Sequence, residues 1–349
     1  MIQGKKRILI VRLGSMGDII HGLPVAATLK ETFPEWEIDW LVESRWRDLL
    51  EGNPSLTRVL SLDTLEWRKQ PMSPGVWAAI RHTIAALQSR RYDYALDLQG
   101  AVKSAVAAAL SGARSIVGFE KPWVKEAACA ALYTRRVRTD AVHVVEANLA
   151  LAGALGADPR HIRFPLPQGD SVGLPADLPQ DGFAVFNPGA GWRSKCWPPE
   201  NYAAVADALQ ENLSLPVILN CGPGEETLAR QVVESCRRAN PKPYLGDIKS
   251  LIALLRRARL MVGPDTGPLH LAAALGVPTV GLFGPTDPRR NGPYGKRQRT
   301  LRPESAETSY RHSSAEGDVM RGIHPERVVE KIYELLGTAE EAIAQLRHL

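Results

Sequence analysis

The stretch that decides the fold of this chain is Gly263–Pro288, with the sequence GPDTGPLHLAAALGVPTVGLFGPTDP. The apolar run Leu260–Val262 precedes it and is typical of the end of a buried strand. The next residues predict a helix over Leu269–Leu275, because Gly276 supplies a C-terminal stop and a proline soon follows. A second strand is expected over Thr279–Phe283. The stretch therefore predicts a strand–helix–strand unit of an α/β fold.

The start of this expected helix points to an anion site. Asp265, Thr266 and Gly267 supply helix-capping groups, and Pro268 suits a first helical position, where no N–H is needed. A short helix that opens directly after a strand directs its free N–H groups to the carboxyl edge of the sheet, where phosphates bind in open α/β folds. His270 lies one turn into the same helix. These residues would also cap an ordinary turn for stability alone, but their density favours a site.

Strands and helices alternate along two stretches of the chain. In the first, strands are expected over Lys5–Leu13 and Glu37–Val42, and an Ala-rich helix over Val102–Leu110. In the second, strands are expected over Phe183–Asn187 and Pro216–Asn220. This alternation predicts two Rossmann-like α/β domains with mostly parallel sheets, helices on both faces of each sheet and a ligand cleft between the domains.

A Pro- and Gly-rich stretch separates the two sets of elements. We therefore predict an N-terminal domain over residues 1–165, a linker over 166–182, a C-terminal domain over 183–325 and C-terminal helices over 326–349. A chain of 349 residues is long enough for two domains.

The composition is that of a globular protein, with 44% hydrophobic and 23% charged residues. No apolar run reaches the length of a membrane span, and the run Ile8–Leu13 is too short for the core of a signal peptide. Scattered cysteines without zinc spacing are typical of a reducing compartment; they are Cys129, Cys196, Cys221 and Cys236. We therefore expect a cytoplasmic protein. The net charge of +5 suits an anionic partner, but without a nucleic-acid-binding motif we do not expect nucleic acid.

The segment Gly14–Asp18, GSMGD, follows the first expected strand. It lacks the glycine spacing of dinucleotide-binding proteins and the lysine of a P-loop, so an oxidoreductase is disfavoured. Asp18 stands at the start of a helix and at the edge of the sheet, where a carboxylate can act as a general base toward an alcohol. On its own the residue is more simply explained as a helix N-cap.

Two further loops follow expected strands of the second half. In Asn187–Pro198, NPGAGWRSKCWP, glycines such as Gly191 let the backbone approach an anion, and Lys195 places a cation beside it. In Cys221–Glu226, Glu225 can accept hydrogen bonds from nucleoside hydroxyls or can cap the next helix. Both loops are expected at the same sheet edge as the anion site.

Cations and tryptophans occur together in two expected loops of the first half, Trp67–Lys69 and Lys121–Lys125. A solvated surface is the default explanation for such charges. If Arg68, Lys69 and Lys125 face the cleft, they suit an acidic, phosphorylated acceptor.

Four motifs, taken in sequence order, are similar to those of a known protein family. They are Gly14–Asp18 with His21, Asp97–Gly100 with Lys103 and Ser104, Asn187–Ala190 with Lys195, Trp197 and Pro198, and Pro264–His270 with Gly284–Pro288. Together they resemble glycosyltransferase family 9, the ADP-heptose:lipopolysaccharide heptosyltransferases, and the resemblance extends from about Arg7 to Leu336.

The resemblance implies a GT-B fold in which the N-terminal half binds the acceptor and the C-terminal half binds the sugar nucleotide. It implies transfer with inversion at the anomeric centre, with neither a metal nor a cofactor, and Asp18 as the general base. The acceptor-binding cations that it implies are Arg68, Lys69 and Lys125. The donor-binding residues that it implies are Gly191, Lys195, Glu225, Asp265, Thr266, Gly267 and His270.

The implied reaction moves L-glycero-D-manno-heptose from ADP-heptose to the Kdo–lipid A inner core of lipopolysaccharide, as in the heptosyltransferase I branch. Gly189–Gly191 lacks the adjacent threonines of that branch and is more similar to the second-heptose branch, so addition of a later heptose is an alternative. A nucleotide-sugar epimerase and a non-catalytic sugar-nucleotide binder are further alternatives. Because the implied acceptor is lipid-linked, an anionic membrane surface on the cytoplasmic side of the inner membrane is an expected contact, through Lys121, Trp123 and Lys125.

Overall fold

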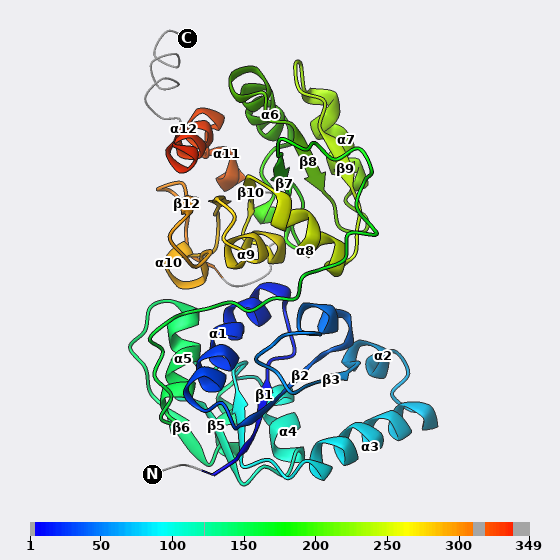
Figure 1. Ribbon diagram of the computed structural model, residues 1–349, viewed down its shortest axis with the longest axis vertical. Coiled ribbons are helices and arrows are strands. Elements are labelled where there is room, and N and C mark those ends of the chain that lie inside the picture. The colour runs from blue at the N-terminus through cyan, green and yellow to red at the C-terminus, as the bar shows by residue number, and fades with distance from the viewer. Residues whose placement is uncertain (1–3, 122, 310–317, 338–349) are drawn as a thin grey trace. The chain divides into compact units, whose positions relative to one another are not determined.

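The computed structural model describes residues 4–121, 123–309 and 318–337. The chain forms two compact units, Met1–Pro167 and Gln168–Leu349 (Figure 1). Within the described residues, each unit contains a parallel sheet of six strands. The predicted fold class, two Rossmann-like α/β units, is therefore confirmed.

The sheet of the first unit has the strand order β3-β2-β1-β4-β5-β6, and all of its pairings are parallel. Its strands are β1 (Arg7–Val11), β2 (Glu37–Glu43), β3 (Arg58–Leu62), β4 (Tyr94–Asp97), β5 (Ser115–Phe119) and β6 (Arg135–Val137). The helices of this unit are α1 (Met16–Thr32), α2 (Thr64–Lys69), α3 (Pro74–Ser89), α4 (Val102–Leu110) and α5 (Val144–Gly153), with short 3-10 helices η1 (Ser44–Leu49) and η2 (Ala127–Leu132). Helix α1 packs with α5, and α3 packs with α4 (Figure 1).

The sheet of the second unit has the order β12-β11-β10-β7-β8-β9, again with parallel pairings. Its strands are β7 (Ala184–Phe186), β8 (Val217–Asn220), β9 (Lys242–Tyr244), β10 (Leu260–Pro264), β11 (Thr279–Leu282) and β12 (Gln298–Leu301). The helices of this unit are η3 (Arg193–Lys195), α6 (Pro199–Leu213), α7 (Glu226–Ser235), α8 (Ile248–Arg257), α9 (Gly267–Ala274), α10 (Pro288–Asn291), α11 (Asp318–Arg321) and α12 (Pro325–Leu336). Helix α6 packs with α7 and α12, and α8 packs with α9.

Both sheets have the same strand order when their strands are counted along the chain. The first strand lies in the middle, the second and third extend the sheet to one side, and the remaining three extend it to the other. The direction of winding therefore reverses between β1 and β4 in one unit and between β7 and β10 in the other. In open α/β sheets ligands bind outside the carboxyl ends of the strands at such a switch point.

The strand cores explain why these segments fold as parallel sheets. Residues Ile8–Val11 of β1 are completely buried, as expected for a strand that is covered by helices on both faces. The C-terminal helices that were predicted from residue 326 as a separate part are not separate, because α12 contributes Val328, Val329 and Ile332 to the core of the second unit. The further helix predicted over residues 339–349 lies outside the described residues.

The stretch predicted as a linker packs closely against the second unit over part of its length. The backbone N–H of Asp170 donates to the Lys249 carbonyl in α8 at 3.0 Å. Gly169 has a positive φ of 81°, and a Cβ there would lie 2.6 Å from that carbonyl oxygen, so only glycine fits this contact. Residues 168–182 thus belong to the second unit.

None of the helices among the described residues is both long and apolar enough to cross a membrane.

Candidate active site

In each unit the predicted site residues follow the strands at the switch point. Asp18 comes after β1, and the motif Asp97–Gly100 ends β4. Lys195 comes after β7, and Asp265 comes directly after β10. Because parallel strands end at the same sheet edge, each pair of loops is neighbouring although its members are far apart in the sequence.

Asp18 lies in the first turn of α1. Ser15 is the N-cap residue, so Asp18 is the third helical residue and not the N-cap that the sequence suggested. The Asp18 carboxylate accepts hydrogen bonds from the Ser15 backbone N–H at 3.0 Å and from the Ser15 hydroxyl at 3.2 Å, as in a capping box. Its side chain is 31% exposed, so the carboxylate is also accessible to a ligand.

Two cations flank this carboxylate. The buried guanidinium of Arg12 forms an ion pair with Asp18 and donates to the Leu98 carbonyl, and the ammonium of Lys125 lies 4.0 Å from Asp18. Burial alone would raise the pKa of the Asp18 carboxyl, but the charges of Arg12 and Lys125 outweigh it and hold that pKa well below its usual range. Arg12 was not among the predicted site residues; the available signal was a lone cation at the end of an apolar strand.

The Asp97 carboxylate is completely buried and holds the neighbouring loop in place. It accepts hydrogen bonds from the backbone N–H groups of Gln99 and Gly100 at 2.9 and 3.2 Å. It also accepts from the hydroxyls of Ser104 and Tyr133 at 3.0 and 2.6 Å. Burial raises the pKa of Asp97, and these donors oppose the rise. This motif therefore fixes the turn between β4 and α4.

A cavity of about 680 Å³ lies in the first unit, and Arg68 and Lys125 are among the residues that line it. Lys69, the third predicted acceptor-binding cation, is not in this lining and pairs with Glu66 at 3.0 Å on the surface. The segment Trp67–Lys69 is the second half of the short helix α2 and not the loop that was expected.

Lys121 and Trp123 were expected to contact a membrane. Lys121 is exposed, whereas Trp123 is half-buried with its ring centroid 6.3 Å from that of Phe119. Trp123 is thus partly used in packing within the first unit.

The second unit brings Lys195, Asp265 and His270 together. The Lys195 ammonium donates to the Asp265 carboxylate at 2.6 Å and to the Asp265 carbonyl at 3.2 Å. The other carboxylate oxygen of Asp265 forms a 2.9 Å hydrogen bond with His270 Nε2. The side chains of Lys195 and Asp265 are only 12% and 9% exposed, and the ammonium also lies 4.7 Å from the centre of the Trp192 ring.

These contacts keep the Asp265 carboxylate charged. Burial would raise its pKa, but the neighbouring His270 and Lys195 lower it by more, so that the pKa lies well below its usual range. A charged Asp265 in turn anchors the Lys195 ammonium beside the start of α9.

Helix α9 begins at Gly267, two residues before the predicted start at Leu269, with Thr266 as N-cap and Gly267 and Pro268 as its first residues. The Thr266 hydroxyl donates to the Pro264 carbonyl at 3.1 Å and does not cap the helix. The first N–H groups of a helix have no intrahelical partner and carry a partial positive charge. A fixed ammonium and a helix N-terminus therefore adjoin at this switch point, which is an arrangement that suits a diphosphate.

Glu225 lies against the glycine loop that follows β7. Its carboxylate accepts the Gly222 N–H at 2.7 Å, and a Cβ at Gly189 would come within 2.0 Å of the Glu225 carboxyl carbon. A side chain at position 189 would therefore displace the Glu225 carboxylate. At Gly191 a Cβ would meet no described atom within 4 Å, so open space lies above that residue.

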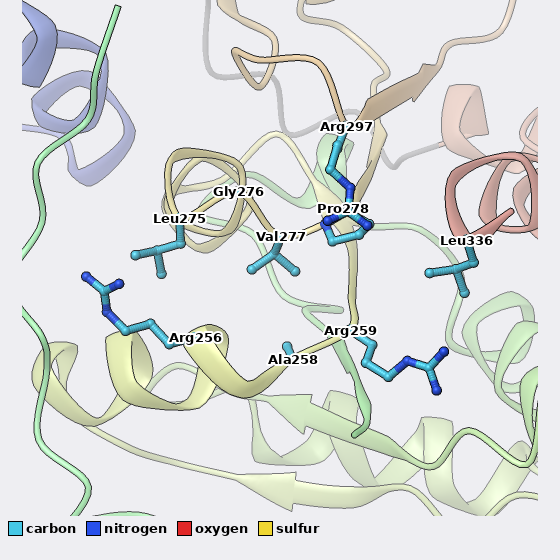
Figure 2. A pocket seen from close by; sticks show the side chains of 9 residues that line it. All are labelled: Arg256, Ala258, Arg259, Leu275, Gly276, Val277, Pro278, Arg297 and Leu336. Carbon is cyan, nitrogen blue, oxygen red and sulfur yellow. The ribbon is translucent and has the colours of Figure 1, made fainter. Parts of the chain in front are cut away.

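A second cavity, of about 360 Å³, lies at the opposite edge of the second sheet. Figure 2 shows Arg259, Pro278 and Arg297 in its wall. These residues directly precede β10, β11 and β12, so the cavity adjoins the amino ends of the strands. It is therefore separate from the site at the start of α9.

Among the described residues, no group of three or more histidine, cysteine, aspartate or glutamate side chains is placed to hold a metal ion.

Known proteins are similar to this chain in both sequence and fold. The family described as Glycosyltransferase family 9 (heptosyltransferase) matches residues 80–319. Lipopolysaccharide heptosyltransferase 1 of Escherichia coli K12 is 30% identical over 301 residues, which cover 85% of this chain and 93% of that protein. The protein of the same name from Pseudomonas aeruginosa is 30% identical over 304 residues, which cover 84% and 82%.

Solved structures agree with this relationship. E. coli heptosyltransferase WaaC with ADP has a TM-score of 0.78 and 28% identity, and the match covers 94% of this chain and 99% of that one. E. coli ADP-heptose lps heptosyltransferase II, at 23% identity and a TM-score of 0.74 over 96% and 99% of the two chains, shares the fold. The predicted GT-B class and the predicted enzyme class, a glycosyltransferase, are thus confirmed. This chain belongs to glycosyltransferase family 9, the heptosyltransferases.

Proposed function

We propose that this heptosyltransferase moves L-glycero-D-manno-heptose from ADP-heptose to the Kdo–lipid A inner core of lipopolysaccharide. Relatives named lipopolysaccharide heptosyltransferase 1 support the acceptor class. Structures of E. coli WaaC with ADP and with ADP-2-deoxy-2-fluoro heptose support the donor. The observation in this chain that carries the proposal is the Lys195–Asp265 pair at the start of α9, because it presents a fixed cation and free N–H groups to one anion.

In the proposed reaction an acceptor hydroxyl attacks the anomeric carbon of the donor. The bond from that carbon to the diphosphate oxygen breaks, ADP leaves, and the configuration inverts. The hydroxyl proton passes to the Asp18 carboxylate. Lys195 and the N–H groups at Thr266 and Gly267 stabilise the negative charge that grows on the diphosphate.

The low pKa of Asp18 constrains this role. The carboxylate is charged at neutral pH and is thus ready to accept a proton, but it is a weak base toward a free alcohol. The alcohol becomes strongly acidic only once its oxygen has begun to bond to the anomeric carbon. We therefore propose that Asp18 orients the hydroxyl first and takes its proton late in the step.

Asp18→Asn tests this assignment. The variant keeps an oxygen that can accept from the Ser15 N–H but removes the charge, so we expect heptose transfer to fall by on the order of 10²–10⁴ with ADP binding unchanged. Ser15→Ala is the matched control, because it removes one hydrogen bond to Asp18 and leaves the carboxylate, and its transfer rate should stay within a few-fold of wild type. A wild-type rate of heptose transfer in Asp18→Asn would show that Asp18 serves only to cap the helix.

The same assay separates the alternative functions. Transfer only to an acceptor that already bears heptose would assign a later heptose. Epimerisation of the donor without any acceptor would replace transfer by a different activity, and donor binding without turnover would indicate a non-catalytic binder.

We also propose that the protein associates peripherally with the anionic cytoplasmic face of the inner membrane. The exposed cations Lys121 and Lys125 support this contact. Co-sedimentation with phosphatidylglycerol vesicles should occur at low salt and weaken at high salt, where surface charges are screened. Equal sedimentation of a Lys121→Gln/Lys125→Gln variant would contradict it.

A further inference from the structure

Helix α4 exposes an apolar stripe. Val102, Val106 and Leu110 follow one another at intervals of four residues, which places them on one face of the helix. These side chains are 38%, 40% and 41% exposed. At 1.5 Å per residue the stripe is about 12 Å long, comparable to an extended decyl chain.

The opposite face of α4 is also without charge. It buries Ser104, Ala105 and Ala108 in the first unit. A surface helix normally turns its charged side chains to solvent, whereas the only charged residue of α4 is Lys103. The exposed stripe is therefore a feature that folding alone does not require.

The stripe forms one wall of the cavity of the first unit. Trp67 of α2 and Leu87 of α3 contribute to the other walls, and Leu13 and Leu62 lie in the lining as well. Nine of the sixteen lining residues are apolar: Leu13, Leu62, Trp67, Leu87, Ala101, Val102, Val106, Ala107 and Leu110. A volume of about 680 Å³ lies within the range of small-molecule sites.

The lining also contains cations. Arg68, Lys103 and Lys125 belong to it, together with the carboxylate of Glu126, and the Lys103 ammonium also pairs with Glu43 at 3.1 Å. The Lys125 backbone N–H donates to the Gly100 carbonyl at 2.9 Å, which places this lysine near the start of α4. Its ammonium lies near the carboxylate assigned as the base. An apolar groove with a cationic end is complementary in charge to an anionic amphiphile.

We propose that this groove binds an acyl chain of the acceptor, with the acceptor's anionic groups at its cationic end. The identity of the acceptor rests on the function proposed above, whereas the preference for an anionic amphiphile rests on the groove alone. The site thus recognises the lipid part of the substrate as well as its sugar.

The groove can be tested with butyl, hexyl and octyl phosphates, used below their micelle concentrations and titrated into the full chain by calorimetry. Each methylene that enters the groove should raise the affinity about fourfold, so octyl phosphate should bind roughly 200-fold more tightly than butyl phosphate. Equal affinity along the series would overturn the proposal.

Substitutions on and outside the stripe show which residues bind the alkyl chain. Val106→Gln replaces a 40% exposed residue by a better helix former, so the helix should be retained, and the gain per methylene should fall below twofold. Arg68→Gln should weaken all three ligands by the same factor and leave the gain per methylene unchanged. Val142→Gln, at a 63% exposed valine outside the lining, is the control and should bind as wild type. An unchanged chain-length dependence in Val106→Gln would place the ligand elsewhere.

A transfer assay, read together with the alkyl phosphate series, distinguishes this proposal from the proposed function. Heptose transfer to a deacylated acceptor without any chain-length effect in the alkyl phosphate series would refute the groove and leave the function standing. A chain-length effect without transfer would refute the function and support the groove. Sedimentation that shows a dimer broken by Val106→Gln would assign the stripe to a second copy and overturn the proposal.

Discussion

Lys195→Met should separate the contribution of Lys195 to catalysis from its contribution to stability. Methionine keeps most of the apolar stem beside Trp192 and removes only the ammonium. The Asp265 carboxylate then loses its 2.6 Å partner and keeps the 2.9 Å hydrogen bond with His270.

The structure sets the expected loss of stability. Removing one partner from a fully buried ion pair costs about 3–5 kcal/mol. Here the side chains of Lys195 and Asp265 are 12% and 9% exposed, and the carboxylate keeps its second partner, so a loss of about 1–3 kcal/mol in the free energy of unfolding is expected. Because domains are typically stable by about 5–15 kcal/mol, the variant should remain folded at room temperature.

The free energy lost in the transfer step should exceed the loss in the free energy of unfolding. The loss of a group that stabilises transition-state charge typically lowers turnover by on the order of 10²–10³, which is about 2.7–4 kcal/mol. The assay is ADP release from ADP-heptose with a deacylated Kdo–lipid A acceptor, next to urea unfolding of the same preparation. Asp265→Asn keeps the ammonium but loosens it, and its rate should lie between those of Lys195→Met and wild type.

If Lys195→Met loses stability as expected but keeps kcat/KM within tenfold of wild type, the ammonium serves Asp265 and not the leaving diphosphate.

Three other substitutions have definite expected outcomes. Gly189→Ala should raise the donor KM and lower the free energy of unfolding, because its Cβ would lie 2.0 Å from the Glu225 carboxyl carbon, and unchanged values of both would contradict the packing argument. Gly191→Ala should leave unfolding unchanged, since no described atom lies within 4 Å of the new Cβ, so a raised donor KM there would report a contact with the ligand itself. Asp18→Asn should lower the free energy of unfolding at pH 7 by removing the ion pair with Arg12. Because the pKa of Asp18 is depressed in the folded state, the stabilisation is complete above about pH 4 and is lost at lower pH, so the difference from wild type in urea unfolding should shrink on acidification.

The part of the fold around Gly263–Pro288 was predictable because its signals are local. Strand β10 ends two residues later than expected, α9 begins at Gly267 and not at Leu269, and β11 starts at Thr279 as predicted. Glycine, proline and capping residues act within a few positions of one another, so a single sequence reveals them.

The contacts within the candidate site were not predictable in the same way. Lys195 and Asp265 are 70 residues apart and meet because β7 and β10 are neighbours in the sheet. The carboxylate of Asp265, expected among the helix-capping groups, instead bonds to a lysine and a histidine. Helices α2 and α3 were also missed, although Val76, Ile80, Ile84 and Leu87 of α3 recur at the spacing of an amphipathic helix.

The division of the chain into two compact units has a consequence for engineering. All of the proposed donor contacts follow strands of the second unit, whereas the proposed base and acceptor cations belong to the first. Under this proposal, specificity for the two substrates is encoded in separate halves of the gene, and recombination near Pro167 would exchange one without rewriting the other. A chimera with the first unit of a relative should keep the ADP affinity of this chain and acquire the acceptor preference of that relative.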